Sequence, residues 1–127
     1  MNKLLLFLLF SSTSSFGQTW DLKVQSTVGN EYYLDMNSIK QKGSLISYSQ
    51  LTNYPDGIDY NGTLFHSTVV SRLTNCVENK FKTVGMIGYS DFDGKGKIVV
   101  VNTKPSKDWI IINMNKITGD IQREVCK

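Results

Sequence analysis

The sequence predicts an α+β fold, in which a curved antiparallel sheet of about six strands carries a C-terminal helix on one face. Apolar and polar residues alternate with a period of two through most of the chain, as they do in half-buried strands. The period becomes helical only near the C-terminus. Two cysteines, Cys76 and Cys126, are placed so that a disulfide would tie this helix to the sheet.

Residues 1–17 have the features of a secretory signal peptide. A basic start at Lys3 is followed by an unbroken apolar run, Leu4 to Phe10, and then by small and polar residues. The run is shorter than the roughly 20 apolar residues that a membrane-spanning helix needs. We expect cleavage after Gly17, which makes Gln18 the mature N-terminus. No cysteine lies near this point to accept a lipid, and we expect an exported protein without a transmembrane anchor.

The remaining chain, residues 18–127, is long enough for one domain with a modest core. Without Lys3 its net charge falls from +3 to +2, and the charges are interspersed, which argues against a nucleic-acid-binding protein. In an exported chain two cysteines usually form a disulfide, with two free thiols as the alternative. A Cys76–Cys126 bond closes a loop of about 50 residues, which stabilises the fold by up to roughly 4 kcal/mol in the chain-entropy model.

Six segments have the alternation and composition of strands, with turn residues between them. Pro55-Asp56-Gly57 predicts a turn, because Pro fixes φ at the second turn position and Gly tolerates positive φ. Asp35 to Lys40 also predicts a local turn. The links are too short for the crossovers that parallel strands require, so we expect antiparallel neighbours. The expected strands are Trp20–Val24, Tyr32–Leu34, Leu45–Tyr54, His66–Asn75, Phe81–Ser90 and Lys97–Asn102.

The apolar patch Trp109–Ile112 precedes the expected helix. Asn113 or Asn115 is its expected N-cap, because an amide oxygen accepts a free N–H of the first turn. Gly119 weakens the interior by roughly 0.5–1 kcal/mol, so the helix should depend on packing against the sheet. The apolar residues at helical spacing are Met114, Ile117, Ile121 and Val125.

The chain has no pattern typical of an enzyme or a metal site, and we expect no catalytic residue, metal or cofactor. His66 is the only histidine and has no second ligand at metal spacing, so a partly exposed strand residue is expected. A hydrolase that uses His66 as its base is the remaining enzymatic alternative. The loop Asp91–Gly94 begins like a calcium loop, but its twelfth position is Asn102 where such a loop requires Glu, which favours a polar hairpin turn.

Two features are candidates for a contact surface. The first is the aromatic-rich loop 54–65, because loops held on a sheet often carry binding residues. Tyr60 and Phe65 could equally fold back as local core, and Asn61-Gly62-Thr63 matches a glycosylation sequon. The second is a group of lysines around the last two strands, which either face an acidic partner or protect strand edges from aggregation. The lysines are Lys80, Lys82, Lys95, Lys97, Lys104 and Lys107, and the candidate contact residues are Tyr54, Tyr60, Phe65, Lys95 and Lys97.

A spaced series of residues runs through the mature chain: Trp20, Tyr33-Leu34-Asp35, Ser38-Ile39, Tyr54, Ser67, Cys76, Tyr89-Ser90, Gly96, Trp109 and Cys126. In this order the chain resembles the surface-adhesin protein E family of bacterial exported proteins. The resemblance implies a six-stranded antiparallel sheet with a C-terminal helix held by the disulfide, and its namesake is a dimeric adhesin for host matrix proteins. The chain departs from the family in lacking a lipidated cysteine and in starting its helix with Asn113-Met114-Asn115.

These observations together predict a non-enzymatic, exported binding module of the bacterial envelope or surface, with an adhesin-like role. The expected partner is a host-matrix or envelope protein, and a homodimer through an open sheet edge is expected from the family. The alternative is a periplasmic inhibitor or envelope-stress protein that acts on another exported protein. Either role places the mature protein in the periplasm or outside the cell.

Overall fold

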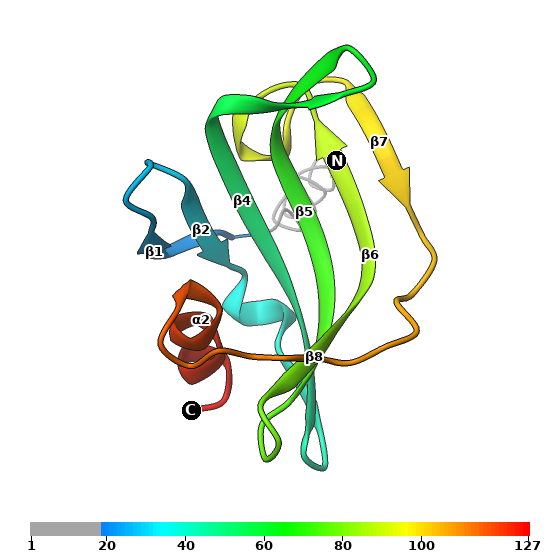
Figure 1. Cartoon of the computed structure of the whole chain (residues 1–127). Coiled ribbons are helices and arrows are strands. Elements are labelled where there is room, and N and C mark those ends of the chain that lie inside the picture. The colour runs from blue at the N-terminus through cyan, green and yellow to red at the C-terminus, as the bar shows by residue number, and fades with distance from the viewer. Residues whose placement is uncertain (1–18) are drawn as a thin grey trace, which may run out of the picture.

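The computed structural model describes residues 19–127, so the expected signal peptide and its cleavage point at Gly17 and Gln18 lie outside the described residues. Figure 1 shows a strongly curved sheet with one helix near the C-terminus. In chain order the elements are β1 (Asp21–Gln25), β2 (Glu31–Leu34), the 3-10 turn η2 (Met36–Ser38), β3 (Lys40–Lys42), β4 (Leu45–Tyr60), β5 (Thr63–Asn75), β6 (Lys80–Tyr89), the 3-10 turn η3 (Phe92–Gly94), β7 (Ile98–Asn102), β8 (Ile110–Ile111) and α2 (Ile117–Val125).

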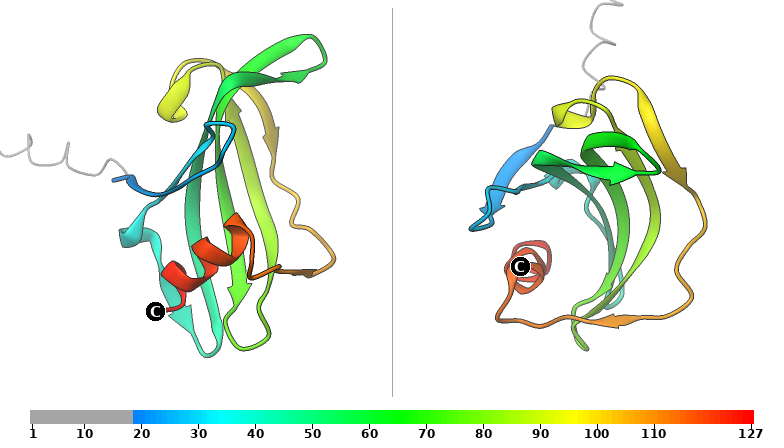
Figure 2. Two further views of the ribbon diagram at one scale, coloured as in Figure 1. Left: turned by 60° about the vertical axis from the view of Figure 1, so that its left-hand side comes forward. Right: turned by 45° about the horizontal axis from the view of Figure 1, so that its top comes forward.

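All strand pairs in the described chain are antiparallel, and the main path through the sheet is β1-β2-β4-β5-β6-β7. The two short strands lie off this path, with β3 beside β4 and β8 beside β6. The sheet is open, since β1 and β7 are each paired on one side only. Figure 2 shows the sheet curling around α2. The antiparallel sheet and the C-terminal helix are therefore confirmed, and the Cys76–Cys126 disulfide is present as well.

The segment Pro55-Asp56-Gly57 is not a turn, which corrects the sequence-based expectation. β4 continues through it, and the pairing with β5 shifts in register between Asn53 and Ile58, as at a bulge. The hairpin turns instead at Asn61-Gly62, whose φ angles are 51° and 88°. Asn-Gly is the most favourable two-residue hairpin turn, because both of its positions require positive φ.

The two short strands were not expected from the sequence. The predicted turn over Asp35 to Lys40 exists as η2, where the Asp35 carboxylate accepts a hydrogen bond of 3.0 Å from the Asn37 amide. The chain then extends into β3 and pairs with the start of β4. β8 arises from the apolar patch, where Ile110 pairs with Phe81. Two or three residues are too few to show a recognisable alternation.

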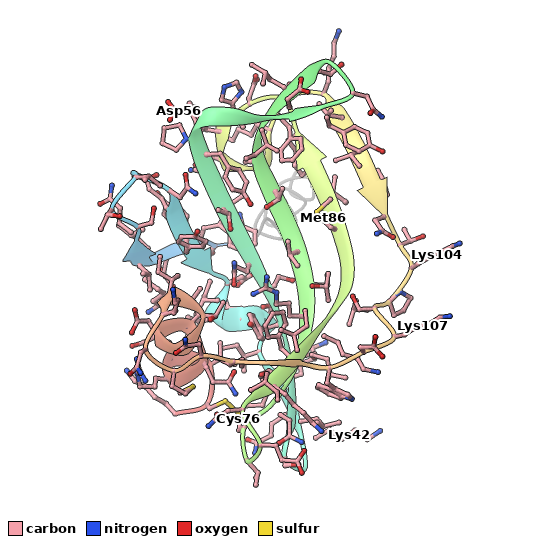
Figure 3. The ribbon with its side chains drawn as sticks, viewed as in Figure 1. Lys42, Asp56, Cys76, Met86, Lys104 and Lys107 are labelled. Carbon is pink, nitrogen blue, oxygen red and sulfur yellow. A yellow bond between two sulfur atoms is a disulfide. The ribbon has the colours of Figure 1, made fainter. Side chains whose placement is uncertain are left out.

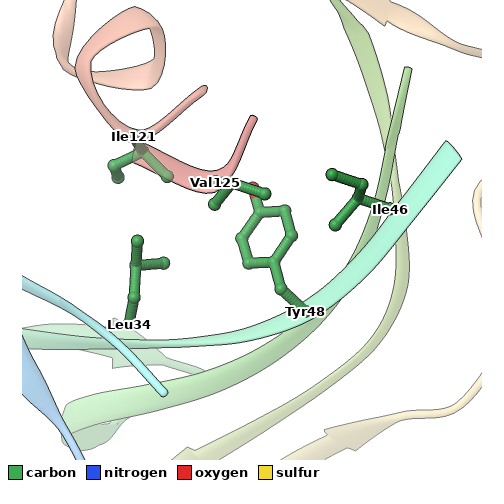
Figure 4. Close-up of a cluster of buried hydrophobic side chains, with 5 residues drawn as sticks. All are labelled: Leu34, Ile46, Tyr48, Ile121 and Val125. Atoms are coloured by element: carbon green, nitrogen blue, oxygen red, sulfur yellow. The ribbon is translucent and has the colours of Figure 1, made fainter. Parts of the chain in front are cut away.

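The main core lies between α2 and the concave face of the sheet (Figure 4). Leu34 comes from β2, Ile46 and Tyr48 come from β4, and Ile121 and Val125 face them from the helix. All five are buried. Burial of apolar side chains on this scale is the main favourable term for a small domain.

Two further contacts fix α2 on the sheet. Cys126, directly after the helix, is bonded to Cys76 after β5, with a Cα–Cα distance of 5.8 Å. The fully buried Gln122 accepts a hydrogen bond of 2.6 Å from the Thr74 hydroxyl of β5. Its amide nitrogen donates to the carbonyl oxygen of Asn75 at 3.1 Å. Both the oxygen and the nitrogen of the buried amide are thereby hydrogen-bonded, as is usual for a buried polar group.

The expected N-cap of the helix is wrong. Lys116 occupies the cap position and its side chain makes no capping hydrogen bond. Asn113 stabilises the preceding turn instead, where its side-chain oxygen accepts a hydrogen bond of 3.0 Å from the Asn115 amide. This turn runs close to the helix, and a Cβ on Gly119 would lie 2.5 Å from the Met114 backbone. Packing therefore favours glycine at position 119, since any larger residue would require the turn at Met114 to move.

Substituting Gly119 with alanine distinguishes packing from helix propensity. Propensity alone predicts a gain in stability of roughly 0.5–1 kcal/mol. The contact with the Met114 backbone predicts a loss of about 1–3 kcal/mol, because the first turn must move away. The free energy of unfolding in urea measures the outcome, with Thr118→Ala as the neighbouring control. A more stable Gly119→Ala protein would contradict this account of the helix start.

Candidate binding surface

The loop after β6, which contains η3, is held on the sheet by two buried polar side chains. The Asn53 amide donates a hydrogen bond of 2.9 Å to the Asp93 carboxylate and accepts one of 2.9 Å from the Asp93 backbone N–H. The Ser67 hydroxyl donates to the carbonyl oxygen of Asp91 at 2.6 Å and accepts from the Gly94 N–H at 2.9 Å. Asn53 and Ser67 are buried and face each other across β4 and β5. We call these contacts the loop clamp.

The loop lies on the face of the sheet opposite α2. Side chains alternate along a strand, so Leu51 and Asn53 point away from the face on which Tyr48 meets the helix. The loop turns through Asp93 and Gly94, whose φ angles are 65° and 70°. Positive φ is costly for Asp93, and the loop clamp offsets this cost by using both its N–H and its carboxylate. The clamp therefore gives a rigid loop in place of a mobile hairpin end.

A hollow of about 490 Å³ opens between this loop and the β1–β2 edge of the sheet. Leu51 and Val69 form an aliphatic floor, and Gly94 allows the loop backbone to approach that floor closely. Such a mixture of aromatic, aliphatic and a few charged side chains is typical of sites that bind another molecule. The residues that line it are Trp20, Tyr33, Leu51, Val69, Tyr89, Asp93, Gly94 and Lys95.

A second hollow of about 400 Å³ adjoins the first and shares Tyr33 and Asp93 with it. The Tyr33 hydroxyl donates a hydrogen bond of 2.9 Å to the Glu31 carboxylate. Partial burial, this hydrogen bond and the negative charges of Glu31 and Asp93 raise the pKa of Tyr33. Tyr33 therefore remains protonated at neutral pH and acts as a hydrogen-bond donor at the ridge between the hollows.

His66 has a structural role at the edge of this surface. Its Nδ1 lies 2.9 Å from the carbonyl oxygen of Ser90, to which it donates. Its ring packs edge-to-face on Phe92, with the centroids 5.2 Å apart. Within residues 19–127 no three His, Cys, Asp or Glu side chains come together in a way that could hold a metal ion. These contacts position the loop and supply no activated nucleophile.

The five residues expected to form the contact surface are distributed over three places. Lys95 lines the first hollow, whereas Tyr60 and Lys97 line a separate one of about 380 Å³ at the β4–β5 hairpin. Phe65 is only 7% exposed and packs edge-to-face on Tyr54, with a centroid distance of 6.1 Å. Phe65 thus follows the alternative in which the loop folds back as local core. The structure does not bring the five together.

The loop clamp was missed at the level of sequence. The sequence predicts a polar turn at Asp91–Gly94, but its buried partners lie far upstream, Asn53 40 residues before Asp93 and Ser67 24 residues before Asp91. A weak signal was present, since Asn53 and Ser67 are polar residues in strands that the apolar pattern predicts to be buried. Only the three-dimensional pairing of the strands shows that both face the loop.

The family model for surface-adhesin protein E matches residues 20–127. No curated protein sequence matches the chain at a significant level.

Two structures of Haemophilus influenzae protein E have a similar fold. One has 18% sequence identity and a TM-score of 0.65, and the match covers 84% of this chain and 83% of that one. A selenomethionine form has 16% identity and a TM-score of 0.64, with 87% of this chain and 92% of that chain covered. At these identities the likeness shows the fold alone.

Substituting Asn53 with aspartate tests the loop clamp. A second carboxylate would face Asp93 at hydrogen-bond distance, so we expect a loss of about 1–3 kcal/mol in the free energy of unfolding at pH 7. The loss relative to the unchanged protein should shrink at low pH, because a protonated carboxyl can donate to its neighbour. Faster hydrogen exchange at residues 91–97 would locate the effect. Asn102→Asp, at an exposed position, is the control, and an equal loss in both variants would contradict the clamp.

Proposed function

The chain belongs to the surface-adhesin protein E family, and from this premise we propose that it is an exported, non-enzymatic binding protein of the bacterial envelope or surface. The single observation that carries the proposal is the rigid loop over the aromatic hollow. The partner is a protein of the host matrix or of the envelope. The contact site is the first hollow together with the second hollow that adjoins it.

The loop clamp supports binding because it reduces the entropic cost of association. A loop that is ordered before binding does not lose its freedom when a partner arrives. Trp20, Tyr33 and Tyr89 add large aromatic surfaces, and such residues are enriched at the energetic centres of protein interfaces. Lys95 and Asp93 at the rim can orient a partner by charge and contribute less to affinity.

The state of the polar groups supports a function without catalysis. The histidine of the described chain donates to a carbonyl oxygen and packs on Phe92. The pKa of Tyr33 is raised, so its hydroxyl is no better a nucleophile than a free tyrosine. Separately, none of the helices within residues 19–127 has the length and hydrophobicity of a membrane span.

The alternative role, inhibition of another exported protein, has one specific feature in its favour. The hairpin of β4 and β5 extends past the bulge at 55–57 and projects at one end of the sheet (Figure 1). At its tip Tyr60 is 46% exposed beside the tight Asn61-Gly62 turn. A stiff hairpin of this kind could enter a cleft of a partner enzyme. Surface exposure in intact cells would favour adhesion, whereas a periplasmic location would favour inhibition.

Capture of partners from extracts tests the proposed site. Immobilised protein should retain the same partner from host-matrix or envelope extracts in repeated experiments, and Trp20→Ala with Lys95→Glu should reduce retention at least tenfold. Lys116→Glu, which changes a similarly exposed charge at the start of α2, should have no effect. Equal retention by both variants would remove the hollow as the contact site. Retention that depends on Tyr60 alone, with one stoichiometric enzyme, would favour the inhibitor.

Self-association through β7 is part of the proposal, because the outer edge of this strand is unpaired. Ile98 and Val101 on it are more than half exposed, and an open apolar edge can pair with a second copy. Light scattering at high concentration should give twice the mass of one chain, and Val101→Lys should return the mass to that of a monomer. A monomer at all concentrations would contradict this step without affecting the hollow.

A further inference from the structure

Four lysines frame an apolar strip on the face of the sheet that points away from α2. Directly paired residues of neighbouring antiparallel strands share a face, so the pairing of β3, β4, β5, β6 and β8 defines rows across the sheet. Each row has one lysine on β3 and one on β6, with a leucine between them. The first row is Lys40, Ser47, Leu73 and Lys82, and the second is Lys42, Leu45, Asn75, Lys80 and Ile111.

The middle of this surface is apolar. A hollow of about 480 Å³ lies beside β3, with Leu45 and Leu73 in its lining and Lys40 and Lys42 at its side. At the other end of the rows Ile111 is 81% exposed. Leu45 and Leu73 form an apolar strip between the lysines, and Ile111 adds an exposed apolar side chain just outside Lys80, on the β8 side. We call the four lysines and this strip the lysine frame.

Trp109 completes the frame on the β6 side. Its ring centroid lies 5.0 Å from the Lys82 ammonium and 5.3 Å from the Lys80 ammonium. A tryptophan between two lysines combines an apolar ring with cationic groups held close to it. Aromatic side chains of this kind are enriched at the level of lipid headgroups, where one side is apolar and the other is wet.

Most of the positive charge in the frame is not neutralised. Glu78 lies 2.7 Å from the Lys80 ammonium, and Asp108 precedes Trp109 in sequence. Among the salt bridges that the described part of the chain forms, none involves Lys40, Lys42 or Lys82. These three charges are therefore available to an anionic partner.

We propose that the lysine frame rests on the surface of an anionic lipid membrane. The lysine ammonium groups contact headgroup phosphates, while Ile111 and Trp109 enter the boundary between headgroups and acyl chains. Lysine suits this role because its long apolar stem can lie along a hydrophobic surface while its charge reaches outward. Basic clusters are attracted to anionic leaflets, and apolar side chains among them add affinity.

The apolar strip decides between a membrane and a hydrophilic polyanion. A sulfated or phosphorylated sugar chain offers charge but no apolar layer for Ile111 and the leucines. The lysine frame lies at one end of the molecule, since Figure 3 shows Lys42 near Cys76 at one end and Asp56 at the opposite end. Asn53 of the loop clamp lies six residues along β4 from Ser47, a separation of roughly 20 Å. A membrane at the frame leaves the loop hollow free for a protein partner.

Co-sedimentation with vesicles tests this inference, with the protein purified as a bacterial host exports it. Vesicles of phosphatidylglycerol and phosphatidylethanolamine should bind it at least tenfold more tightly than phosphatidylcholine vesicles, and added salt should weaken the binding. The triple variant Lys40→Gln, Lys42→Gln and Lys82→Gln should lose this preference. A matched triple variant at exposed lysines elsewhere, Lys97→Gln, Lys104→Gln and Lys116→Gln, should retain it. Equal binding by both triple variants would overturn the proposal.

Fluorescence separates insertion from simple attraction of charge. Trp20→Phe leaves Trp109 as the single tryptophan, whose emission should shift to the blue on anionic vesicles. Ile111→Ser keeps every charge and should weaken binding severalfold. Unchanged emission, together with equally tight binding to heparin, would overturn the membrane assignment in favour of a polyanion site. Because Trp20→Ala and Lys95→Glu do not alter the frame, loss of protein capture and loss of vesicle binding are distinguishable.

Discussion

The fold depends on one constraint, namely that a single helix must cover the concave face of the sheet, with no second sheet packed against that face. A nine-residue helix is too short to be stable alone, so its position has to be supplied by tertiary contacts. Ile121 and Val125 supply apolar area, and Gln122 fixes the register by pairing with Thr74. The disulfide at Cys126 then holds the last turn against the end of β5. Loss of any one of these contacts weakens the others, because all act on the same short element.

A buried amide has the same role on each face of the sheet. Gln122 docks the helix on the concave side, and Asn53 docks the η3 loop on the other. In both cases a carboxamide is used because it donates and accepts at once, so that it pairs with the backbone and with another side chain. Burying an amide costs free energy, and the hydrogen bonds that offset this cost form only when the helix and the loop are in their native positions. The curved sheet thereby becomes a rigid support for the loop hollow.

The sequence predicted what depends on local pattern and failed where distant residues decide. Alternation located the six strands of the main path, although β4 extends past its expected end at Tyr54 and β5 begins before His66. The cysteine count with the expected compartment predicted the disulfide. The Pro55-Asp56-Gly57 segment was misinterpreted because a bulge and a turn use the same residues, and only the pairing of Ile58 with Phe65 distinguishes them. The sequence predicts only that Gly119 weakens the helix. The structure shows that the Met114 backbone lies close to where a Cβ on residue 119 would be. The loop clamp and the lysine rows require the register between strands, which no single segment contains.

The charge pattern makes the two surfaces compatible in one molecule. The sequence groups Lys80 and Lys82 with later lysines as a candidate basic patch, whereas folding places them with Lys40 and Lys42 on one face at one end. At the other end the loop side carries Glu31, Asp91 and Asp93 together with Lys95 and Lys97, so its charges are mixed. A chain with small net charge can thus have a marked asymmetry of charge, which orients it in the field of an anionic surface without binding polyanions at random. Such an orientation would direct the loop side away from the membrane, towards the proteins that the hollow is proposed to bind.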